Sequence, residues 1–444
     1  MRRDGPASLH RPAPGPARGK EEWMQVFGQH DENTLRQLER VAEQARRVAL
    51  MADGHVGYVM PIGGVAGYAG RVSVVGVGFD IACGNAAIRT DLTLEGLVGL
   101  GREELERDPR RALRDRTLQR LADEIADTIS FGVGRRNEQD DAPVDHPLFG
   151  SDAWSLVPER GGGRTGREEL RQKARRQLGT VGSGNHYVDV FADEAGVIWV
   201  GVHFGSRGLG HTIASGFLAL GQGAAWDARV PEREVLLDLA TPLGQDYWAL
   251  MELAGAYAYA GREWVARKVV ALLGGTEQAL VHNHHNFAWK EVHQGEELVV
   301  VRKGATPAFP GQAGFIGGSM GDDAVIVEGA TPADEAVAAL QQAALYSTVH
   351  GAGRVMSRTQ AAGKVHRRTG RVLAPGRVSP AMMQEWVHDR GVVLRGGGLD
   401  ESPQVYRRLP RVLAAQGDTI TVRHVLRPLI VLMAGADTVD PYKD

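Results

Sequence analysis

The side chains best suited to metal chemistry are one thiol, one carboxylate and three imidazoles. Cys83 is the only cysteine among 444 residues and follows Asp80 closely in the stretch GVGFDIACGN. His186, His203 and His285 lie beside glycine, serine or asparagine in GSGNHYVDV, VGVHFGSRG and VHNHHNFAWKE. Each group alone has a plainer interpretation, since a lone cysteine often packs as a small apolar side chain. Together they favour a transition metal over magnesium or calcium, and a thiolate bridging two ions would accommodate all the ligands.

A second set of residues could bind or transfer phosphate. His350 begins the stretch HGAGRVMSR, which also holds Arg354 and Arg358. The small residues would let the backbone approach a phosphate, and the arginines would clamp it. A neutral imidazole at this place could act as a base or as a nucleophile. A tight structural turn capped by the histidine is the alternative.

Two further stretches could line the same site. The loop GGSMG at 317–321 offers free backbone N–H groups to a phosphate or a nucleobase, although it is not a Walker A motif. Asp53 and His55 in ADGHVGY could support a ligand or accept a proton, and an ordinary turn is the alternative.

Helices and strands from the whole chain must position these residues. Apolar spacing and charge-rich stretches predict helices over 30–50, 102–125, 167–177 and 245–274. Glycine-punctuated or apolar stretches predict strands within 57–85, 197–204, 296–305 and 418–435. Since helices and strands intermingle and no internal repeat divides the chain, we expect one large α/β catalytic domain with mixed sheets flanked by helices.

Composition bounds the class of protein. The formal net charge of -3 gives no overall positive field, so a polyanion would need a local patch. One cysteine excludes an internal disulfide and indicates a reducing compartment, which we take to be the cytoplasm. No run of about 18 apolar residues predicts a membrane span. We expect a disordered, basic, Pro/Gly-rich arm at 1–20, the catalytic domain at 21–444, and a mobile loop at 133–166 within it.

The order and length of the motifs resemble the RtcB family of RNA ligases. From about residue 45 to 435 they read ADGHVGYVMPIGG, GVGFDIACGN, GTVGSGNHYVDV, VHFGSRGLGH, HHN, RKGA, GSMG and HGAGRVMSR. The resemblance implies a single-domain fold, a monomer and GTP-dependent joining of RNA 3′-phosphate or 2′,3′-cyclic phosphate ends to 5′-hydroxyl ends, in tRNA splicing or RNA repair. It also implies two manganese ions, whereas ligand softness alone favours zinc.

The resemblance assigns roles to individual residues. Asp80, Cys83, His203 and His285 would hold one ion, Cys83 and His186 would hold the other, and His350 would accept GMP from GTP. The nucleotide pocket would be lined by Asn185, Asp189, Asn286, Gly317, Gly318, Ser319, Met320, Gly351, Ala352, Gly353 and Tyr406. Three arginines would contact RNA phosphates: Arg207, Arg354 and Arg358.

The chain departs from the family's pattern at a few positions. Asp189 replaces a glutamate, Gly317 a proline, Ala324 a polar residue, and Met433 with Ala434 a lysine–glycine pair. We expect these changes to lie around the nucleotide and to alter guanine selectivity. The alternatives are a metal-dependent phosphoesterase that acts on RNA ends without nucleotide, and a non-catalytic protein that binds RNA ends around a structural metal.

Overall fold

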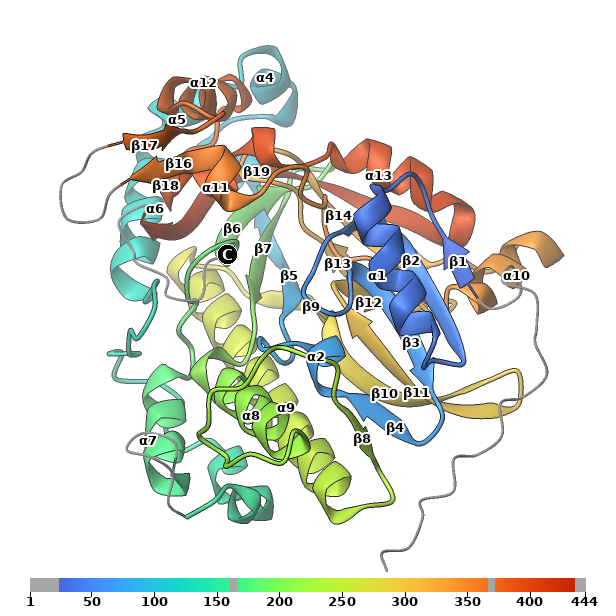
Figure 1. Ribbon diagram of the computed structural model, residues 1–444. Helices are drawn as coiled ribbons and strands as arrows, with labels where there is room; N and C mark the ends of the chain where they lie inside the picture. Colours follow the sequence, from blue (N-terminus) through green and yellow to red (C-terminus); the bar gives the residue numbers. More distant parts are fainter. Residues whose placement is uncertain (1–23, 160–165, 366–371, 436–444) are drawn as a thin grey trace, which may run out of the picture.

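A computed structural model describes residues 24–159, 166–365 and 372–435 (Figure 1). Helices and strands alternate along all three stretches, and sheets are flanked by helices, which confirms the predicted mixed α/β fold. The expected arm at 1–20 lies outside the described residues. Of the expected loop at 133–166, the described part contains the short 3-10 helices η2 (Pro147–Gly150) and η3 (Asp152–Leu156), and its mobility remains a prediction.

The larger sheet has eight strands, and the candidate metal ligands lie at the ends of its strands or in the segments next to them. In spatial order its strands are β13 (Ala313–Ile316), β14 (Ala324–Gly329), β19 (Ile420–Gly435), β6 (Tyr187–Ala192), β7 (Val197–Phe204), β5 (Gly84–Thr93) and β9 (Glu277–His284), with β18 (Val393–Gly397) parallel to β19. The strands β7, β5 and β9 are antiparallel neighbours. The first residues of β5 and β6 therefore lie beside the last residues of β7 and β9, at one end of these strands.

Two long helices cover one face of this sheet. The helix α6 (Arg116–Thr128) and the C-terminal half of α9 (Pro242–Leu272) share an apolar cluster with alternate residues of β6, such as Val188 and Val190. Because side chains alternate along a strand, Tyr187 and Asp189 face the opposite side. The helix α9 begins three residues before the predicted start at 245, because Thr241 accepts the N–H of Gly244 and proline occupies the first turn.

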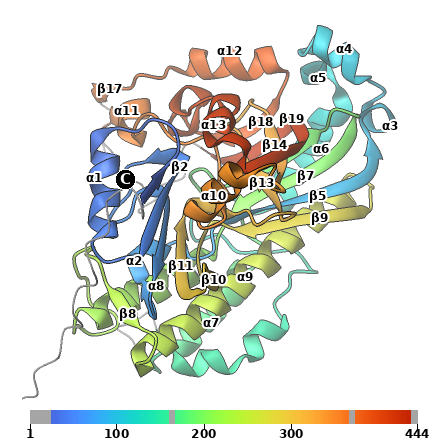
Figure 2. The same cartoon turned by 90° about the vertical axis from the view of Figure 1, so that its right-hand side faces the viewer.

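A second, five-stranded sheet lies beside the first (Figure 2). Its spatial order is β1 (Met24–Val26), β2 (Arg47–His55), β3 (Ile62–Tyr68), β11 (Glu296–Lys303) and β10 (Asn286–His293). Apolar side chains of β2, β3 and β11 are buried on both faces of this sheet. The helices α1 (Glu32–Ala42) and α8 (Arg207–Gly221) share the cluster on one face, and α13 (Leu409–Gln416) the cluster on the other.

The remaining elements are short or peripheral. Three two-stranded sheets pair β12 (Ala305–Pro307) with β15 (Ser347–Val349), β16 (Gly363–Val365) with β17 (Val372–Pro375), and β4 (Arg71–Ser73) with β8 (Leu236–Asp238). The other helices are α2 (Val74–Val77), α3 (Leu94–Val98), α4 (Arg102–Arg107), α5 (Arg111–Arg114), α7 (Arg167–Gln177), α10 (Glu335–Ala343), α11 (Arg358–Ala362) and α12 (Pro380–Arg390), with 3-10 turns at η4 (Leu399–Glu401), η5 (Pro403–Val405) and η6 (Gly417–Thr419). Within the described ranges, no helix combines the length and the apolarity needed to cross a membrane.

Several predicted boundaries were wrong. The helix expected over 30–50 ends at Ala42, and Val48 lies in β2, because its apolar spacing fits a buried strand as well as a helix. The helix expected over 102–125 is three separate helices. The breaks fall near Pro109, which cannot continue a helix, and at Asp115, which caps the next one.

Candidate active site

A cavity of about 860 Å³ lies where the two sheets meet. It is lined by every residue that the sequence singled out as a metal ligand, nucleotide contact or nucleophile, and also by His55, Arg354 and Arg358. Two candidates do not line it: Asp53 lies behind His350, and Arg207 lies beside His186 but outside the cavity wall. Residues separated by hundreds of positions thus line one partly open cavity of a size suited to a small-molecule ligand.

The turn that carries Cys83 is held tightly in place. The N–H of Cys83 donates to the carbonyl of Asp80 over 3.0 Å, and the N–H of Ala82 donates to that of Asn286 over 2.7 Å. Ala82 has a φ of 61°, in the left-handed region that a residue with a Cβ seldom adopts. The carbonyl of Cys83 also accepts the N–H of His285 over 2.8 Å. These bonds fix the thiol against the junction between β9 and β10.

Two of the histidines are oriented through one ring nitrogen, which leaves the other free. The Nδ1 atom of His186 lies 2.9 Å from the carbonyl of Val181, and that of His203 lies 3.0 Å from the carbonyl of Asn185. A carbonyl can only accept, so each Nδ1 carries a proton and each Nε2 points toward the thiol. In the neutral ring of His203 that atom presents a lone pair, whereas Nε2 of His186 also faces the Asp80 carboxylate, 3.2 Å away. Such fixed tautomers are typical of histidines that bind metals.

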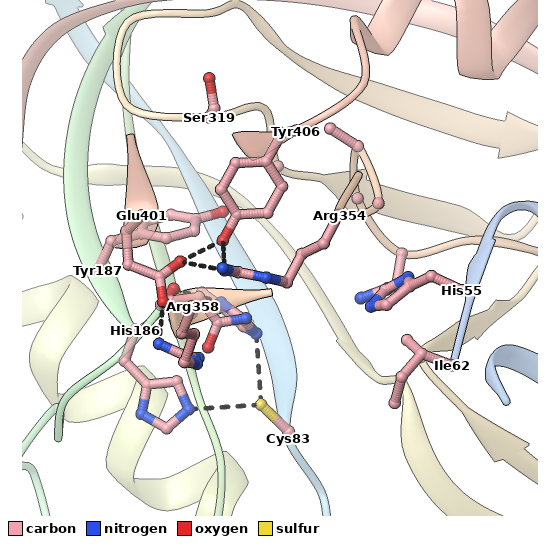
Figure 3. A pocket seen from close by; sticks show the side chains of 18 of the residues that line it. His55, Ile62, Cys83, His186, Tyr187, Ser319, Arg354, Arg358, Glu401 and Tyr406 are labelled. Atoms are coloured by element: carbon pink, nitrogen blue, oxygen red, sulfur yellow. Dashed lines mark hydrogen bonds and ion pairs between the residues drawn. The ribbon is translucent and has the colours of Figure 1, made fainter. Parts of the chain in front are cut away.

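The free ring nitrogens converge on the thiol. Sγ of Cys83 lies 3.3 Å from Nε2 of His203 and 3.6 Å from Nε2 of His186 (Figure 3), and Nε2 of His285 lies 3.3 Å from that of His203. Oδ2 of Asp80 lies 3.2 Å from Nε2 of His186. The ligand atoms therefore form two groups that share Cys83, one with His203 and His285 and the other with Asp80 and His186.

This grouping differs from the expected division in one respect. The sequence analysis placed Asp80 with His203 and His285, whereas the structure brings its carboxylate to His186. Each group then offers three ligands, and a thiolate shared between two ions satisfies both. Three protein ligands would leave an open position on a bound ion, as in catalytic rather than structural sites.

Burial and neighbouring charges shift the pKa values of these ligand groups. It lowers the pKa of His203 to about 3 and holds that of His285 well below its usual value, so both imidazoles stay neutral. Burial acts to raise the pKa of Asp80, but the hydrogen bond and charge of His186 outweigh it, and the carboxylate stays ionised. Burial and then the charge of Asp80 raise the pKa of Cys83 well above its usual value. A bound cation would displace that proton, so the donor set fits a transition metal.

His350 shares the cavity with these ligands and has its own carboxylate partner. Its ring centre lies 4.9 Å from that of His285, and its Nδ1 lies 2.6 Å from Oδ2 of the completely buried Asp53. The same oxygen accepts the backbone N–H groups of His350 and Gly351 over 3.1 and 3.2 Å. Gly353 has a φ of 73°, and a Cβ there would lie 2.3 Å from the carbonyl of Asp53. Only glycine allows this loop to approach so closely.

The two cavity arginines are already paired with carboxylates. Arg354 donates to Glu401 over 3.1 Å, and Arg358 also contacts Glu401 (Figure 3). Arg358 lies 3.1 Å from the Asp400 carboxylate as well. Tyr406 donates its hydroxyl to Glu401 and accepts from Arg354 over 3.1 Å. This network forms a wall of the cavity, and the contacts of these arginines with RNA phosphates remain a prediction. The partner carboxylates were missed from the sequence, although they lie in the stretch LDESPQVYRR that holds the tyrosine.

One end of the cavity is largely apolar but holds two unsatisfied oxygens. Met320, Val431 and Met433 pack together there. The Tyr187 hydroxyl and Oδ1 of Asp189 are buried without a hydrogen-bond partner. Burial raises the pKa of Asp189 well above its usual value, against a backbone hydrogen bond from Leu432. A neutral carboxyl can both donate and accept, so this end could bind the polar edge of a planar base.

Not all of the departures from the family pattern lie in the cavity. Asp189, Gly317 and Met433 line it as expected. Ala324 does not, because it is buried in an apolar cluster with Phe315 and Leu426. Ala434, named with Met433, does not line the cavity either, so the prediction that all the departures surround the nucleotide pocket was wrong for these two residues.

Comparisons with known proteins place the chain among characterised relatives. Residues 34–434 match the family model described as tRNA-splicing ligase RtcB. The chain is 31% identical over 409 residues to the RNA-splicing ligase RtcB of Escherichia coli strain K12, covering 87% of this chain and 89% of that protein. It is 32% identical over 381 residues to the tRNA-splicing ligase RtcB of Archaeoglobus fulgidus, covering 71% and 74%. It is 31% identical over 443 residues to the RNA-splicing ligase RtcB of Mycobacterium tuberculosis, covering 85% and 94%.

Proposed function

This chain belongs to the RtcB family, as its motifs predicted, and on this premise we propose that it is an RNA ligase. It would join an RNA end with a 3′-phosphate or a 2′,3′-cyclic phosphate to a 5′-hydroxyl end, in tRNA splicing or RNA repair. The observation that carries the proposal is the shared cavity: His350 lies 4.9 Å, ring to ring, from His285 of the metal-ligand cluster. A nucleophile and a divalent-metal site so close together suit phosphoryl transfer.

Two divalent ions would be held by the two ligand groups that share Cys83, with manganese as the family's usual metal and zinc as the alternative. When bound, such ions offset the negative charge that develops on phosphate oxygens and on a leaving pyrophosphate. The fit rests on the convergence of a thiol, a carboxylate and three imidazoles within the described residues.

The nucleophile would be Nε2 of His350. With Nδ1 at 2.6 Å from Asp53, the carboxylate stabilises the positive charge that the ring gains on attack. Attack on the α-phosphorus of GTP forms an N–P bond and breaks the P–O bond to pyrophosphate. The GMP then passes to the RNA 3′-phosphate, and the 5′-hydroxyl displaces GMP to form the new phosphodiester. A cyclic phosphate would first be opened by water.

The nucleotide would occupy the cavity between His350 and the apolar end. Asn185, Asn286 and the loop at 317–320 line this path, so side-chain amides and backbone N–H groups could bind phosphate and ribose oxygens. Asn286 is held in place, because its Oδ1 accepts the N–H of Gly304 over 2.7 Å. The base would then reach the two unsatisfied oxygens of Tyr187 and Asp189.

The proposal is tested by incubating the protein with α-labelled GTP and Mn²⁺ and mapping any covalent GMP adduct by mass spectrometry. The adduct is expected on His350 and should disappear in His350→Ala. It should persist in His388→Ala, which removes an exposed histidine of α12 outside the cavity. No adduct with any divalent metal or nucleotide would refute the proposal.

The departures from the family pattern at the apolar end of the cavity are a reason to test two alternatives separately. Opening of a 2′,3′-cyclic phosphate without GTP, together with no adduct, would identify a metal-dependent phosphoesterase. RNA binding that survives Cys83→Ala, with neither reaction detected, would identify a non-catalytic protein that binds RNA ends.

A further inference from the structure

One buried arginine lies directly beneath the cluster of metal ligands. Arg262, in the middle of α9, has no exposed surface. Its Nη1 donates to the carbonyls of Ala82 and Phe204 over 2.8 and 2.6 Å, its Nη2 lies 2.8 Å from Nδ1 of His284, and its Nε donates to His282 over 2.9 Å. One guanidinium therefore joins three segments of the chain that are far apart in sequence.

These contacts fall immediately beside the candidate ligands. Ala82, Phe204 and His284 are the direct neighbours in sequence of Cys83, His203 and His285, respectively. Arg262 thus contacts the residue next to every ligand of one of the two groups.

The strand register explains why the contacts have this pattern. Gly84 pairs with Phe204 on one side and with His284 on the other, so these three residues form one row across β7, β5 and β9. Side chains alternate along each strand, so the neighbours in sequence of this row face the cavity while the row itself faces α9. Phe204 accordingly packs in the apolar cluster shared with α9, and His284 stacks on Tyr259 of that helix with ring centres 3.8 Å apart.

Gly84 makes room for the guanidinium. A Cβ at this position would lie 3.1 Å from Nη2 of Arg262 and 2.2 Å from the carbonyl of Asn283. Because Gly84 has no side chain, the guanidinium of Arg262 fits beside the three paired residues, and β9 can approach β5 closely.

The hydrogen-bond partners of Arg262 are all neutral. Two are carbonyls and two are imidazole ring nitrogens that accept from the guanidinium, which a doubly protonated ring could not do. Burial also lowers the pKa of Arg262 to about 10, which still leaves it charged at neutral pH. A buried charge without an ionised partner in contact is costly, so simple packing does not explain this residue.

We propose that Arg262 is the positioning residue of the metal centre: it fixes the backbone beside Cys83, His203 and His285 so that their ligand atoms converge. It also holds the carbonyl of Ala82, whose left-handed backbone turns the thiol toward the two imidazoles. A flexible ammonium could not make four bonds in the fixed directions of the guanidinium plane. This role rests on the metal centre of the proposed function.

The test compares Co²⁺ binding by the wild-type protein, Arg262→Lys and the matched control Arg267→Lys. Arg267 lies on the same helix but bonds only to Glu263 and Glu277 at the surface. Titrations follow the thiolate-to-cobalt charge-transfer absorption, which reports the bond between Cys83 and the ion and not merely the fold. Circular dichroism and thermal unfolding establish that each variant is folded.

We expect Arg262→Lys to bind Co²⁺ at least tenfold more weakly, with reduced charge-transfer absorption, while Arg267→Lys matches the wild type. A folded Arg262→Lys with wild-type affinity and absorption would overturn the role. If this variant does not fold, His284→Phe removes one of the four acceptors, and unchanged Co²⁺ binding by that variant would equally overturn it. Wild-type protein that binds neither Co²⁺, Mn²⁺ nor Zn²⁺ would instead refute the metal centre, and with it the proposed function.

Discussion

Replacing Asp53 by asparagine should slow the attack by His350 without disturbing the metal ligands. Asparagine has the same size, and its oxygen can still accept the two backbone N–H groups that Oδ2 binds at 3.1 and 3.2 Å. The negative charge 2.6 Å from Nδ1 of His350 is lost. The imidazole then gains positive charge on attack with only a neutral partner beside it.

The size of the effect follows from the contact that is lost. This contact is an ion pair without hydrogen-bond geometry, and a hydrogen bond to a charged group, at about 1.5–3 kcal/mol, sets the scale of its contribution. Since about 1.4 kcal/mol changes a rate tenfold, Asp53→Asn should slow adduct formation roughly 10- to 150-fold. The free energy of unfolding should change by only about 1 kcal/mol, because removing a completely buried charge offsets the weaker hydrogen bonds.

The assay is a single-turnover measurement of GMP transfer to His350 at saturating GTP and Mn²⁺. Metal content is measured in parallel, because Asp53 belongs to neither ligand group. An adduct rate within twofold of the wild type would refute the reasoning. So would a variant that loses its metal or its fold together with its activity, since Asp53 would then be a structural residue and not a partner of the nucleophile.

Three further outcomes are expected. Co²⁺ affinity should rise about tenfold per pH unit near neutrality, because the Cys83 thiol must lose its proton to bind while His203 and His285 are already neutral. Titrations at several pH values would contradict this if the affinity were flat. Glu401→Ala should destabilise the protein by about 3–5 kcal/mol in urea unfolding, because it leaves two partly buried guanidiniums without that carboxylate. Met433→Lys should raise the preference for GTP over ATP in adduct formation by about tenfold. An ammonium at this position would keep the Asp189 carboxylate ionised, so that it could accept from guanine N–H groups. An unchanged ratio of GTP to ATP use would mean that the nucleobase does not bind at this end of the cavity.

The fold class was predictable because hydrophobic periodicity is a local property. The helix over 167–177 and the strand over 197–204 occur as predicted, since each has a clear pattern and clear ends. The strand after Ala42 was not predicted, because its apolar residues suit both a helix and a strand. Only its burial between two layers identifies it as a strand.

The chemical groups of the site were predictable, but their grouping was not. Residue types and motifs brought the five metal ligands and His350 into one hypothesis, and the structure places them around one cavity. The carboxylate of Asp80 could not be assigned to one ion or the other, because that depends on a side-chain direction. Arg262 did carry a signal: it interrupts the apolar stripe formed by Ala258, Val265 and Val269 on a long helix, where a charge needs a specific partner.

The contrast between His284 and His285 shows what the sequence lacks. Both stand in the same HHN stretch, and residue type gives no reason to prefer one as a ligand. The strand register decides: His284 pairs with Gly84 and faces α9, so the next residue faces the cavity. A shift of one residue in the pairing of β9 with β5 would exchange the two side chains. The convergence of the candidate metal ligands therefore depends on a strand register that Gly84 permits, and the guanidinium of Arg262 contacts β7, β9 and the turn before β5 at this register.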